Sequence, residues 1–451
     1  MKAKYDIRIP DEVLFIIGKL NSTGYKAYIV GGCVRDGIMG RVPQDWDICT
    51  SSLPDETMSI FDKAIDTGAK HGTVTVVVNG KGYEVTTFRL DGVYRDNRRP
   101  ERVDFTSSIE EDLGRRDFTI NAMAYHPVEG FIDPYKGTCD IKKKLIRAVG
   151  NPEKRFLEDA LRMLRAVRFS AQLDFSIDPA TFQSIKSCCR LITNISYERI
   201  RDELTKILVS SNPMNFSLLK ETGLLHHILP EFELCYDIRQ NHPYHLFNVA
   251  LHSLYSVSNI ENVPVLRWAM LLHDLGKSRT KTTDEKNIDH FYGHPQVSTG
   301  MAKDILNRLR FDNKNSELIC RLIRFHDRSI ETNHKAVRRA LNVIGEDIFE
   351  YLLKVKEADK KAQNPEYLEE GLSYLNVIKS IYLDIKQKQQ CTSLKDLAVD
   401  GKDLINLGLR QGKEIGEVLQ KLLKSVIENP ELNEKEKLLE LARRIPGKRR
   451  G

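Results

Sequence analysis

Residues 31–47 of the chain, GGCVRDGIMGRVPQDWD, decide the fold of its first part. The two glycines follow the apolar run 28–30, which predicts a strand that ends in a turn where backbone amides can approach a ligand closely. Arg35 places a permanent positive charge beside this turn. Asp45 and Asp47 lie two residues apart, and a strand turns such residues to the same face, where they can share Mg²⁺ ions.

This combination matches the needs of one kind of chemistry. A glycine turn with an arginine for phosphate, followed by a metal-binding carboxylate pair, is what transfer of a nucleotidyl group requires. A bare Asp-x-Asp pair is more often two solvated aspartates on a surface turn. The prediction therefore depends on whether the chain supplies the other parts of such a site.

Length, charge and cysteine usage describe a globular protein of several domains. The chain has 451 residues, which exceeds one ordinary core, so we expect roughly two to four domains. The eight cysteines form no C-x-x-C pair and no zinc spacing, which indicates reduced structural thiols. We find no signal-peptide pattern and no run of membrane-spanning length, and we expect a cytoplasmic protein. The net charge of +6 and the basic end ARRIPGKRRG favour a polyanionic partner.

The first part of the chain alternates strand and turn patterns. Residues 11–23 predict a helix, and two β-branched runs around Asn79-Gly80 predict a hairpin. We therefore expect a small α/β head built on a β-sheet. The polar stretch 89–105, RLDGVYRDNRRPERVDF, predicts an exposed, mobile loop.

From about residue 141 the pattern changes to helical periodicity, which continues to the C-terminus. We predict an α/β plus all-α fold class. Polar and Pro-containing stretches interrupt the pattern and suggest four parts: a head at 1–140, a helical neck at 141–235, a third part at 236–365 and a helical tail at 366–451.

A second polar cluster lies at residues 115–122, RRDFTINA. An Arg-Arg-Asp run between apolar stretches is, by itself, more often a salt-bridged helix start. Beside a phosphate-binding turn, however, Arg116 can reach a triphosphate while Asp117 accepts a hydrogen bond from a ribose hydroxyl.

A third cluster, EDALRMLRAVR at residues 158–168, could choose a base. Its residues spaced by three predict a polar ridge on one helix: Asp159, Arg162, Arg165 and Arg168. The neighbouring leucines predict the buried face: Leu157, Leu161 and Leu164. Most such ridges are solvated faces. As a binding edge, an Asp/Arg pair would accept from the amino group of cytosine or adenine and donate to the adjacent ring nitrogen, whereas uracil and guanine have the opposite polarity.

These three clusters, in this order and spacing, resemble the class II tRNA nucleotidyltransferases, the CCA-adding enzymes, which share their catalytic head with bacterial poly(A) polymerases. The similarity is dense from Tyr28 to Ile207, and the tail DGKDLINLGLRQGKEIGEVLQKLLKSV is also similar. The resemblance implies a polymerase-β-like nucleotidyltransferase head. It also implies Mg²⁺-dependent, template-independent addition of C, C and A to the 3′ end of tRNA from CTP and ATP, with release of pyrophosphate.

The resemblance implies a role for each residue of the site. Asp45 and Asp47 would hold Mg²⁺, and Glu84 would be a third acidic residue that helps to deprotonate the primer 3′-hydroxyl. Gly32 and Arg35 would bind the triphosphate. The remaining nucleotide-binding residues would be Arg116 and Asp117, which contact the nucleotide, Asp159 and Arg162, which template the base, and Arg165 and Arg168, which support them.

Partial reactions and a related enzyme remain as alternatives. Residues 88–100 match the flexible loop that family members use to change from adding C to adding A, and enzymes that add only CC tend to lack it. A-only addition stays open. Poly(A) polymerase also stays open, although no Gly-Arg-Arg-Phe-like run follows the carboxylates. We expect the helical remainder to hold tRNA by shape and phosphate contacts, with no stable protein partner and no membrane. Candidate contacts are Lys142, Lys143, Lys144, Arg308, Arg310, Arg449 and Arg450.

A second constellation follows in the helical part: His252, His273, Asp274, His294, His326 and Asp359. Imidazole and carboxylate ligands together bind divalent metals, although scattered histidines are ordinarily core or surface residues. Their order and the local sequences ALHSL, LLHDLGK, FYGHP, RFHD and KEADKKA resemble the HD phosphohydrolases. The resemblance implies a second divalent metal and an additional phosphohydrolase activity, as a 2′,3′-cyclic phosphodiesterase or a phosphatase. A phosphohydrolase whose head only holds RNA is therefore a rival hypothesis, and a non-catalytic RNA-binding protein is disfavoured.

Overall fold

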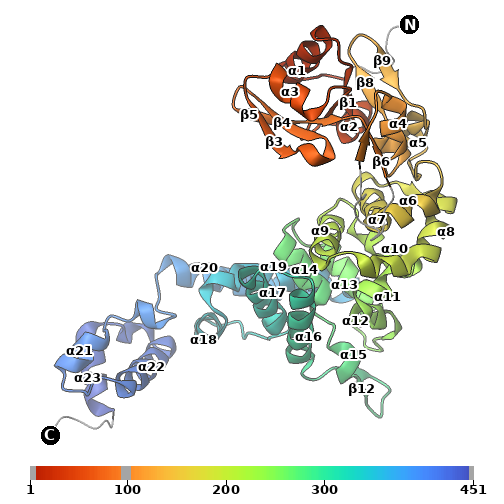
Figure 1. The fold of residues 1–451 in the computed structure, drawn as a ribbon. Coiled ribbons are helices and arrows are strands. Elements are labelled where there is room, and N and C mark those ends of the chain that lie inside the picture. The colour runs from red at the N-terminus through yellow and green to blue at the C-terminus, as the bar shows by residue number, and fades with distance from the viewer. Residues whose placement is uncertain (1–6, 93–102, 446–451) are drawn as a thin grey trace. The chain divides into compact units, whose positions relative to one another are not determined.

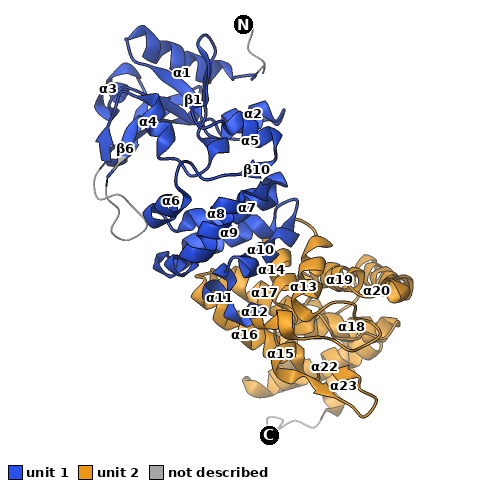
Figure 2. Cartoon of the chain, turned by 90° about the vertical axis from the view of Figure 1, so that its right-hand side faces the viewer, with its two compact units in different colours: residues 1–233 blue, residues 234–451 orange. Residues whose placement is uncertain are grey.

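The computed structural model describes residues 7–92 and 103–445. Two compact units divide the chain, residues 1–233 and residues 234–451 (Figure 2). The finer division into four parts stays a prediction. Within the described residues, no helix is both long enough and apolar enough to cross a membrane.

A seven-stranded mixed sheet forms the head (Figure 1), with the strand order β3-β4-β5-β2-β1-β8-β9. Its strands are β1 (Ala27–Val30), β2 (Ile48–Thr50), β3 (Ala64–Gly68), β4 (Thr73–Val78), β5 (Lys81–Thr87), β8 (Ala124–His126) and β9 (Gly130–Ile132). Neighbours are antiparallel except for β2 and β5, which are parallel. The predicted hairpin joins β4 to β5, and Asn79 and Gly80 both adopt the positive φ angles that such a turn requires.

In the described part of the head the α-helices are α1 (Asp11–Ser22), α2 (Gly32–Ile38), α3 (Pro54–Ile60), α4 (Ile109–Gly114) and α5 (Gly137–Lys142). Helix α1 has Asp11 and Glu12 in its first turn and Lys19 near its end, which suits the helix dipole. One core of the head contains Tyr28 and Val30 of β1 packed with Phe88. Cys49 of β2 belongs to the same core, and β1 pairs with β2.

The loop predicted over residues 89–105 is partly wrong. Its ends pair as two short antiparallel strands, β6 (Arg89–Asp91) and β7 (Val103–Phe105). The backbone N–H of Arg89 donates to the Asp112 carboxylate over 3.3 Å, and the Phe105 ring packs on Gly72, so both strands are anchored to the head. The middle of the predicted loop, residues 93–102, lies outside the described residues.

The neck of the first unit is helical, as predicted, apart from the short parallel pair β10 (Leu145–Ile146) and β11 (Ser176–Ile177). Its α-helices are α6 (Pro152–Glu158), α7 (Leu161–Leu173), α8 (Pro179–Cys188), α9 (Tyr197–Leu208), α10 (Leu218–Glu221), α11 (Leu224–Ile228) and α12 (Pro230–Glu233). The head and this helical body confirm the predicted fold class.

The single helix predicted across residues 157–168 is broken. Asp159 has an extended backbone (φ −139°, ψ 105°) and separates α6 from α7, because its carboxylate accepts from the N–H of Leu161 over 3.1 Å. Asp159 therefore does not share a helix with the three arginines. Leu157 is exposed, contrary to its predicted place in the buried face, whereas Leu161 and Leu164 are buried as predicted.

The second unit is almost entirely helical. Its helices are α13 (Val249–Ser258), α14 (Pro264–Leu272), α15 (Lys277–Thr280), α16 (His294–Arg308), α17 (Asn313–Phe325), α18 (His334–Ile344), α19 (Glu346–Lys361), α20 (Leu368–Gln387), α21 (Gly401–Asn406), α22 (Lys413–Glu428) and α23 (Lys435–Arg444). A short hairpin, β12 (Thr282–Thr283) and β13 (Asp289–His290), interrupts them. Helix α14 ends at Leu272, so His273 and Asp274 lie in the turn that follows it.

Two glycines of the head make a matched stability test. A methyl group at Gly137 would collide with the backbone oxygen of Thr119 and lie 2.8 Å from the Met123 sulfur, whereas Gly18 has nothing within 4 Å. We expect Gly137→Ala to lower the free energy of unfolding by about 1–3 kcal/mol. Gly18→Ala, in the middle of α1, should raise it by up to about 1 kcal/mol. Urea unfolding of both variants measures this, and equal effects would contradict the packing at Gly137.

Candidate active site and metal centre

A cavity of about 550 Å³, the head cavity, is lined by residues of the head sheet, the α4–β8 connection and α7. Its charged lining residues are Arg35, Asp47, Glu84, Arg89, Arg115, Arg116, Asp117, Arg162, Arg165 and Arg168. Gly31, Gly32, Asn121 and Phe169 also line it. Seven arginines against three carboxylates make this cavity strongly positive, which suits a polyphosphate. The structure thus brings together nearly all of the predicted head residues, but Asp45 and Asp159 are not among the described lining residues of this cavity.

Gly31 brings the backbone close to the charged groups of this cavity. Its φ of +84° is a left-handed conformation that favours glycine, and a Cβ there would lie 3.0 Å from Arg116 Nη1 and 3.8 Å from Asp47 Oδ2. The sequence prediction named Gly32, which begins α2, and missed the stronger requirement at Gly31. The sequence signal for this requirement at Gly31 was the glycine pair that follows β1.

Asp45, Asp47 and Glu84 lie together around a smaller hollow of about 350 Å³, the carboxylate pocket. Asp45 and Asp47 are exposed on either side of buried Trp46, so they share a face as predicted, although β2 begins only at Ile48. The parallel register that pairs Ile48 with Val85 brings Asp47 beside Glu84, one residue earlier on each strand.

Electrostatics around Asp47 favour a cation. Nearby protein raises the pKa of Asp47 by keeping part of the bulk water away; Arg116 lowers this pKa, and the negative charge of Asp45 raises it. Clustered carboxylate oxygens that repel one another are the donor set that Mg²⁺ prefers. The three side chains therefore fit a bound Mg²⁺.

Buried carboxylates hold the arginines from behind. Asp112, which is fully buried, pairs with Arg115 at 2.7 Å and with Arg116 at 3.3 Å, and both arginines lower its pKa although burial alone would raise it. Arg35 donates to the Asn121 side-chain oxygen over 2.8 Å. Sequence reasoning missed both residues. The signal for Asp112 was its helical spacing, three and four residues before Arg115 and Arg116, whereas no spacing pattern connects Asn121 to Arg35.

Asp117 is engaged by α7. Its carboxylate accepts from Arg165 at 2.6 and 2.7 Å and from the backbone N–H of Phe118 at 2.8 Å. Burial alone would raise the pKa of Asp117, but Arg165 and Arg162 lower it to about 2. The predicted hydrogen bond from Asp117 to a ribose stays a prediction.

The arginines of the predicted ridge face the head cavity, each with its own carboxylate. Arg162 pairs with Glu158 at 2.6 Å, and Arg168 pairs with Glu203 of α9 at 2.7 Å. Asp159 instead pairs with Arg199 of α9 at 2.9 Å. Asp159 and Arg162, which were predicted to read the base together, are therefore each paired with a different residue in the structure.

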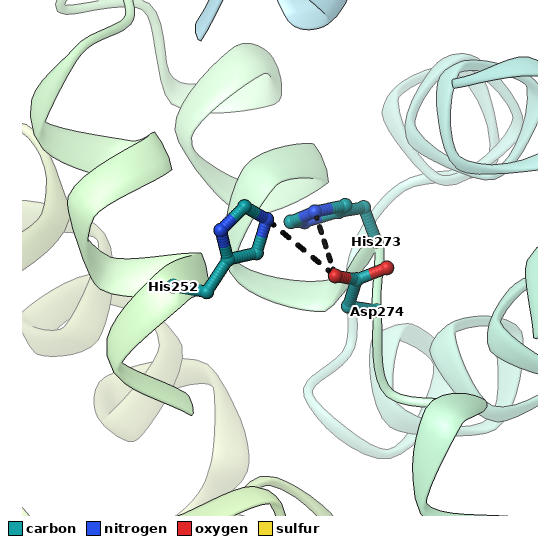
Figure 3. A group of neighbouring side chains, drawn as sticks. All are labelled: His252, His273 and Asp274. Carbon is teal, nitrogen blue, oxygen red and sulfur yellow. Dashed lines mark ion pairs between the residues drawn. The ribbon is translucent and has the colours of Figure 1, made fainter. Parts of the chain in front are cut away.

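The second unit contains a separate group of five buried residues and the half-buried Asp359, the histidine cluster: His252, His273, Asp274, His294, His326 and Asp359. All six predicted residues come together, although they derive from five separate segments. Figure 3 shows the rings of His252 and His273 directed at the Asp274 carboxylate, at 3.6 and 3.3 Å. His294 and His326 approach its other oxygen at 3.3 and 3.6 Å. Asp274 is thus shared by two groups that could each hold a metal ion.

Hydrogen bonds fix which ring nitrogen of each histidine faces the cluster. The Nδ1 atoms of His273, His294 and His326 lie 2.7–2.8 Å from backbone oxygens, which can only accept, so each Nδ1 carries the proton. In the neutral ring, each Nε2 then presents a lone pair inward, to which a proton or a metal ion can bind. The Nε2 atoms of His294 and His326 are 3.2 Å apart, a distance at which two lone pairs repel unless a proton or cation lies near them.

The cluster attracts positive charge. Burial alone would lower the pKa of His273, but Asp274 and Asp359 raise it to about 10. His273 Nε2 and Asp274 Oδ1 are buried, and no hydrogen bond to either is found within the described residues. Imidazole nitrogens and carboxylate oxygens that lie close together without hydrogen bonds are suitable ligands for a divalent transition metal. Lys277, which the sequence prediction missed, pairs with Asp274 at 2.8 Å.

Comparisons with known protein families cover most of the chain. A family model described as "Poly A polymerase head domain" matches residues 27–147. A second, "Probable RNA and SrmB- binding site of polymerase A", matches residues 174–235, and a third, tRNA nucleotidyltransferase domain 2, matches residues 280–442.

Individual relatives agree with these matches. A CCA-adding enzyme of Ligilactobacillus salivarius is 36 % identical over 97 % of this chain and 98 % of that enzyme. A CCA-adding enzyme of Geobacillus stearothermophilus is 53 % identical over 47 % of this chain and 53 % of that enzyme. The crystal structure of the Bacillus stearothermophilus CCA-adding enzyme in complex with CTP is similar with a TM-score of 0.70 and 32 % identity, over 96 % of both chains.

The ion pair of Asp117 has a pH signature. A pKa lowered from 3.8 to about 2 means that the folded state gains stability above the unfolded pKa and loses it as the pH falls toward 2. We expect Asp117→Asn to reduce the free energy of unfolding by about 2 kcal/mol at pH 7. The difference from the wild type should shrink between pH 5 and pH 3 in urea unfolding. A difference that stays constant with pH would contradict this account.

Proposed function

Since the chain belongs to the family of CCA-adding enzymes, we propose that its head adds C, C and A to the 3′ end of tRNA from CTP and ATP. Pyrophosphate leaves at each step. The observation that supports this most is that the head cavity brings Asp47 and Glu84, which also line the carboxylate pocket, together with seven arginines. A polymerase that selects the base with its own residues needs the metal-binding carboxylates and the nucleotide-binding arginines within reach of one nucleotide.

The carboxylate pocket would act on the primer. Asp45 and Asp47 would hold Mg²⁺, which when bound lowers the pKa of the terminal hydroxyl and neutralises charge on the attacked phosphate. Glu84, which lies beside Asp47 in the parallel register, would accept the proton of the 3′-hydroxyl.

The arginines would hold the triphosphate. Gly31 and Gly32 allow its close approach to the backbone, while Arg35 and Arg116 offer N–H donors to the oxygens of the leaving pyrophosphate. The partners behind them, Asn121 and Asp112, keep these guanidinium groups oriented before the nucleotide arrives.

Base selection would use Asp159 and Arg162, with Arg165 and Arg168 in support. Asp159 is paired with Arg199 and Arg162 with Glu158. A cytosine or adenine edge would therefore share or replace these two ion pairs. Uracil and guanine cannot do so, because their donor and acceptor order is reversed.

The tRNA would be held by helical surfaces, with Lys142, Lys143, Lys144, Arg308 and Arg310 as candidate phosphate contacts. Arg449 and Arg450 lie outside the described residues. The cytoplasmic location also stays a prediction. Poly(A) polymerase remains the alternative, and it would extend RNA with ATP alone.

Removal of the carboxylate pair tests the head. We expect Asp45→Ala with Asp47→Ala to reduce nucleotide addition to tRNA by roughly 10³-fold or more, because no other described carboxylate pair borders the cavity near Glu84. Addition of radiolabelled CTP and ATP measures it. Asp62→Ala, an exposed aspartate of the same unit, is the control. Addition that survives in the double variant would show that the site is misassigned.

A second activity is favoured by the histidine cluster, and we propose that the second unit binds divalent metal and hydrolyses phosphoesters. His252, His273, His294 and His326 would hold metal with Asp274 and Asp359. The bound metal would supply an activated water for attack on phosphorus. Lys277 and Lys360, which line the adjoining cavity of about 350 Å³, would attract the phosphate group.

Metal content tests this second proposal directly. We expect His273→Ala and Asp274→Ala to lose bound divalent metal, measured by elemental analysis, and to lose hydrolysis of phosphoesters while nucleotide addition by the head persists. His334→Ala, an exposed histidine of α18, should keep both the metal and the hydrolysis. Chelation should also lower the melting temperature of the wild type, because metal binds only the folded cluster. Unchanged metal content in both variants would refute the metal site.

A further inference from the structure

We propose that Phe169 is a positioning residue that holds three arginines of the head cavity, Arg35, Arg165 and Arg168, as one phosphate-binding group. The inference rests on the proposed function, because it concerns the nucleotide that the head would bind. It gives Arg165 and Arg168 a task other than support of a base-reading edge.

Three cations surround one aromatic ring. The guanidinium carbons of Arg35, Arg165 and Arg168 lie 5.4, 5.4 and 4.1 Å from the centroid of the Phe169 ring. All three distances fall within the range in which an aromatic face attracts a cation. Arg35 comes from α2 in the head, whereas the other two belong to α7, so the ring joins side chains of two separate elements.

The ring has a physical task because like charges are crowded in this cavity. Burial lowers the pKa of Arg168, Glu203 raises it, and the positive charge of Arg165 lowers it further. Carboxylates relieve the repulsion only in part: Arg165 has Asp117 at 2.6 Å, and Arg168 has Glu203 at 2.7 Å. The negative face of a ring stabilises each guanidinium without occupying its N–H groups, which stay available for phosphate oxygens.

Phe169 can orient the arginines because its own position is fixed. It is 5 % exposed and contacts Phe118 edge to face, with ring centroids 5.8 Å apart. Phe118 is fully buried and follows Asp117, the partner of Arg165. Phe118, which contacts the Phe169 ring, and Asp117, whose carboxylate binds Arg165, are therefore adjacent residues of one segment.

The simpler explanation is that Phe169 only fills the core. A core residue would affect stability according to its volume and would be indifferent to the charge distribution of the ring. A positioning role through cation–π contacts depends on that charge distribution, since fluorine atoms withdraw electron density from the face while changing ring size little. These two expectations can be separated by experiment.

The test replaces Phe169 with Leu and, in the full chain, with mono-, di- and trifluorinated phenylalanine. We expect Phe169→Leu to raise the KM for CTP and for ATP by roughly tenfold each, with kcat changed less than about twofold. The fluorinated series should raise both KM values in steps that follow the number of fluorines. Phe156→Leu, at a fully buried ring of α6 outside the cavity lining, controls for loss of core volume.

Equilibrium binding of CTP and of inorganic tripolyphosphate, measured by calorimetry on the same variants, tests the role of Phe169 in phosphate binding separately from nucleotide addition to tRNA. Weaker binding of both ligands, graded with fluorination, supports the inference even if no nucleotide is added. Equal binding by the fluorinated variants and the wild type would overturn it. A changed preference for CTP and ATP over UTP and GTP, with tripolyphosphate binding unchanged, would also overturn it, because the arginines would then serve the base. Failure of the wild type to add nucleotides to tRNA would refute only the proposed function.

Discussion

The ion pair between Asp117 and Arg165 joins the β-sheet head to α7, and the arrangement of the head cavity depends on it. A buried pair stabilises a fold only when its remaining hydrogen-bonding groups are satisfied. Asp117 meets this condition through the N–H of Phe118 at 2.8 Å and the side-chain amide of Asn121 at 3.3 Å. Asn121 in turn accepts from Arg35. One network therefore sets the distance between the glycine turn and the arginines of the neck.

Apart from Asp117, which pairs with Arg165 and lines the cavity itself, the carboxylates that hold the arginines of the head cavity are not among its described lining residues. Asp112 serves Arg115 and Arg116 in this way, and Glu203 serves Arg168. The carboxylate pocket is the exception, because its acidic groups are exposed and close to one another. The histidine cluster of the second unit has a different chemistry, with buried imidazoles around shared carboxylates. Oxygen ligands suit Mg²⁺ and imidazoles suit transition metals, so the two sites are expected to bind different ions.

Several features of the fold and of both sites could be predicted from the sequence, because short motifs indicate them. The hairpin at Asn79-Gly80, the exposed pair around Trp46 and the gathering of six histidine and aspartate residues followed from local pattern or family resemblance. The break at Asp159 could not be predicted from helical spacing, because a single side-chain hydrogen bond to the N–H of Leu161 outweighed the periodicity. The contacts of Glu203 with Arg168 and of Phe169 with Arg35 were also beyond reach, because only the tertiary fold brings these residues close.

The central claim is that one head cavity adds two different nucleotides in a set order without a template. The most direct measurement incubates tRNA that ends at the discriminator base with Mg²⁺ and with CTP alone, ATP alone or both, and sizes the products to one nucleotide. The account predicts two added residues with CTP, none with ATP alone, and three with both. Products that stop after C residues in the presence of both nucleotides, or that grow with ATP alone, would contradict it.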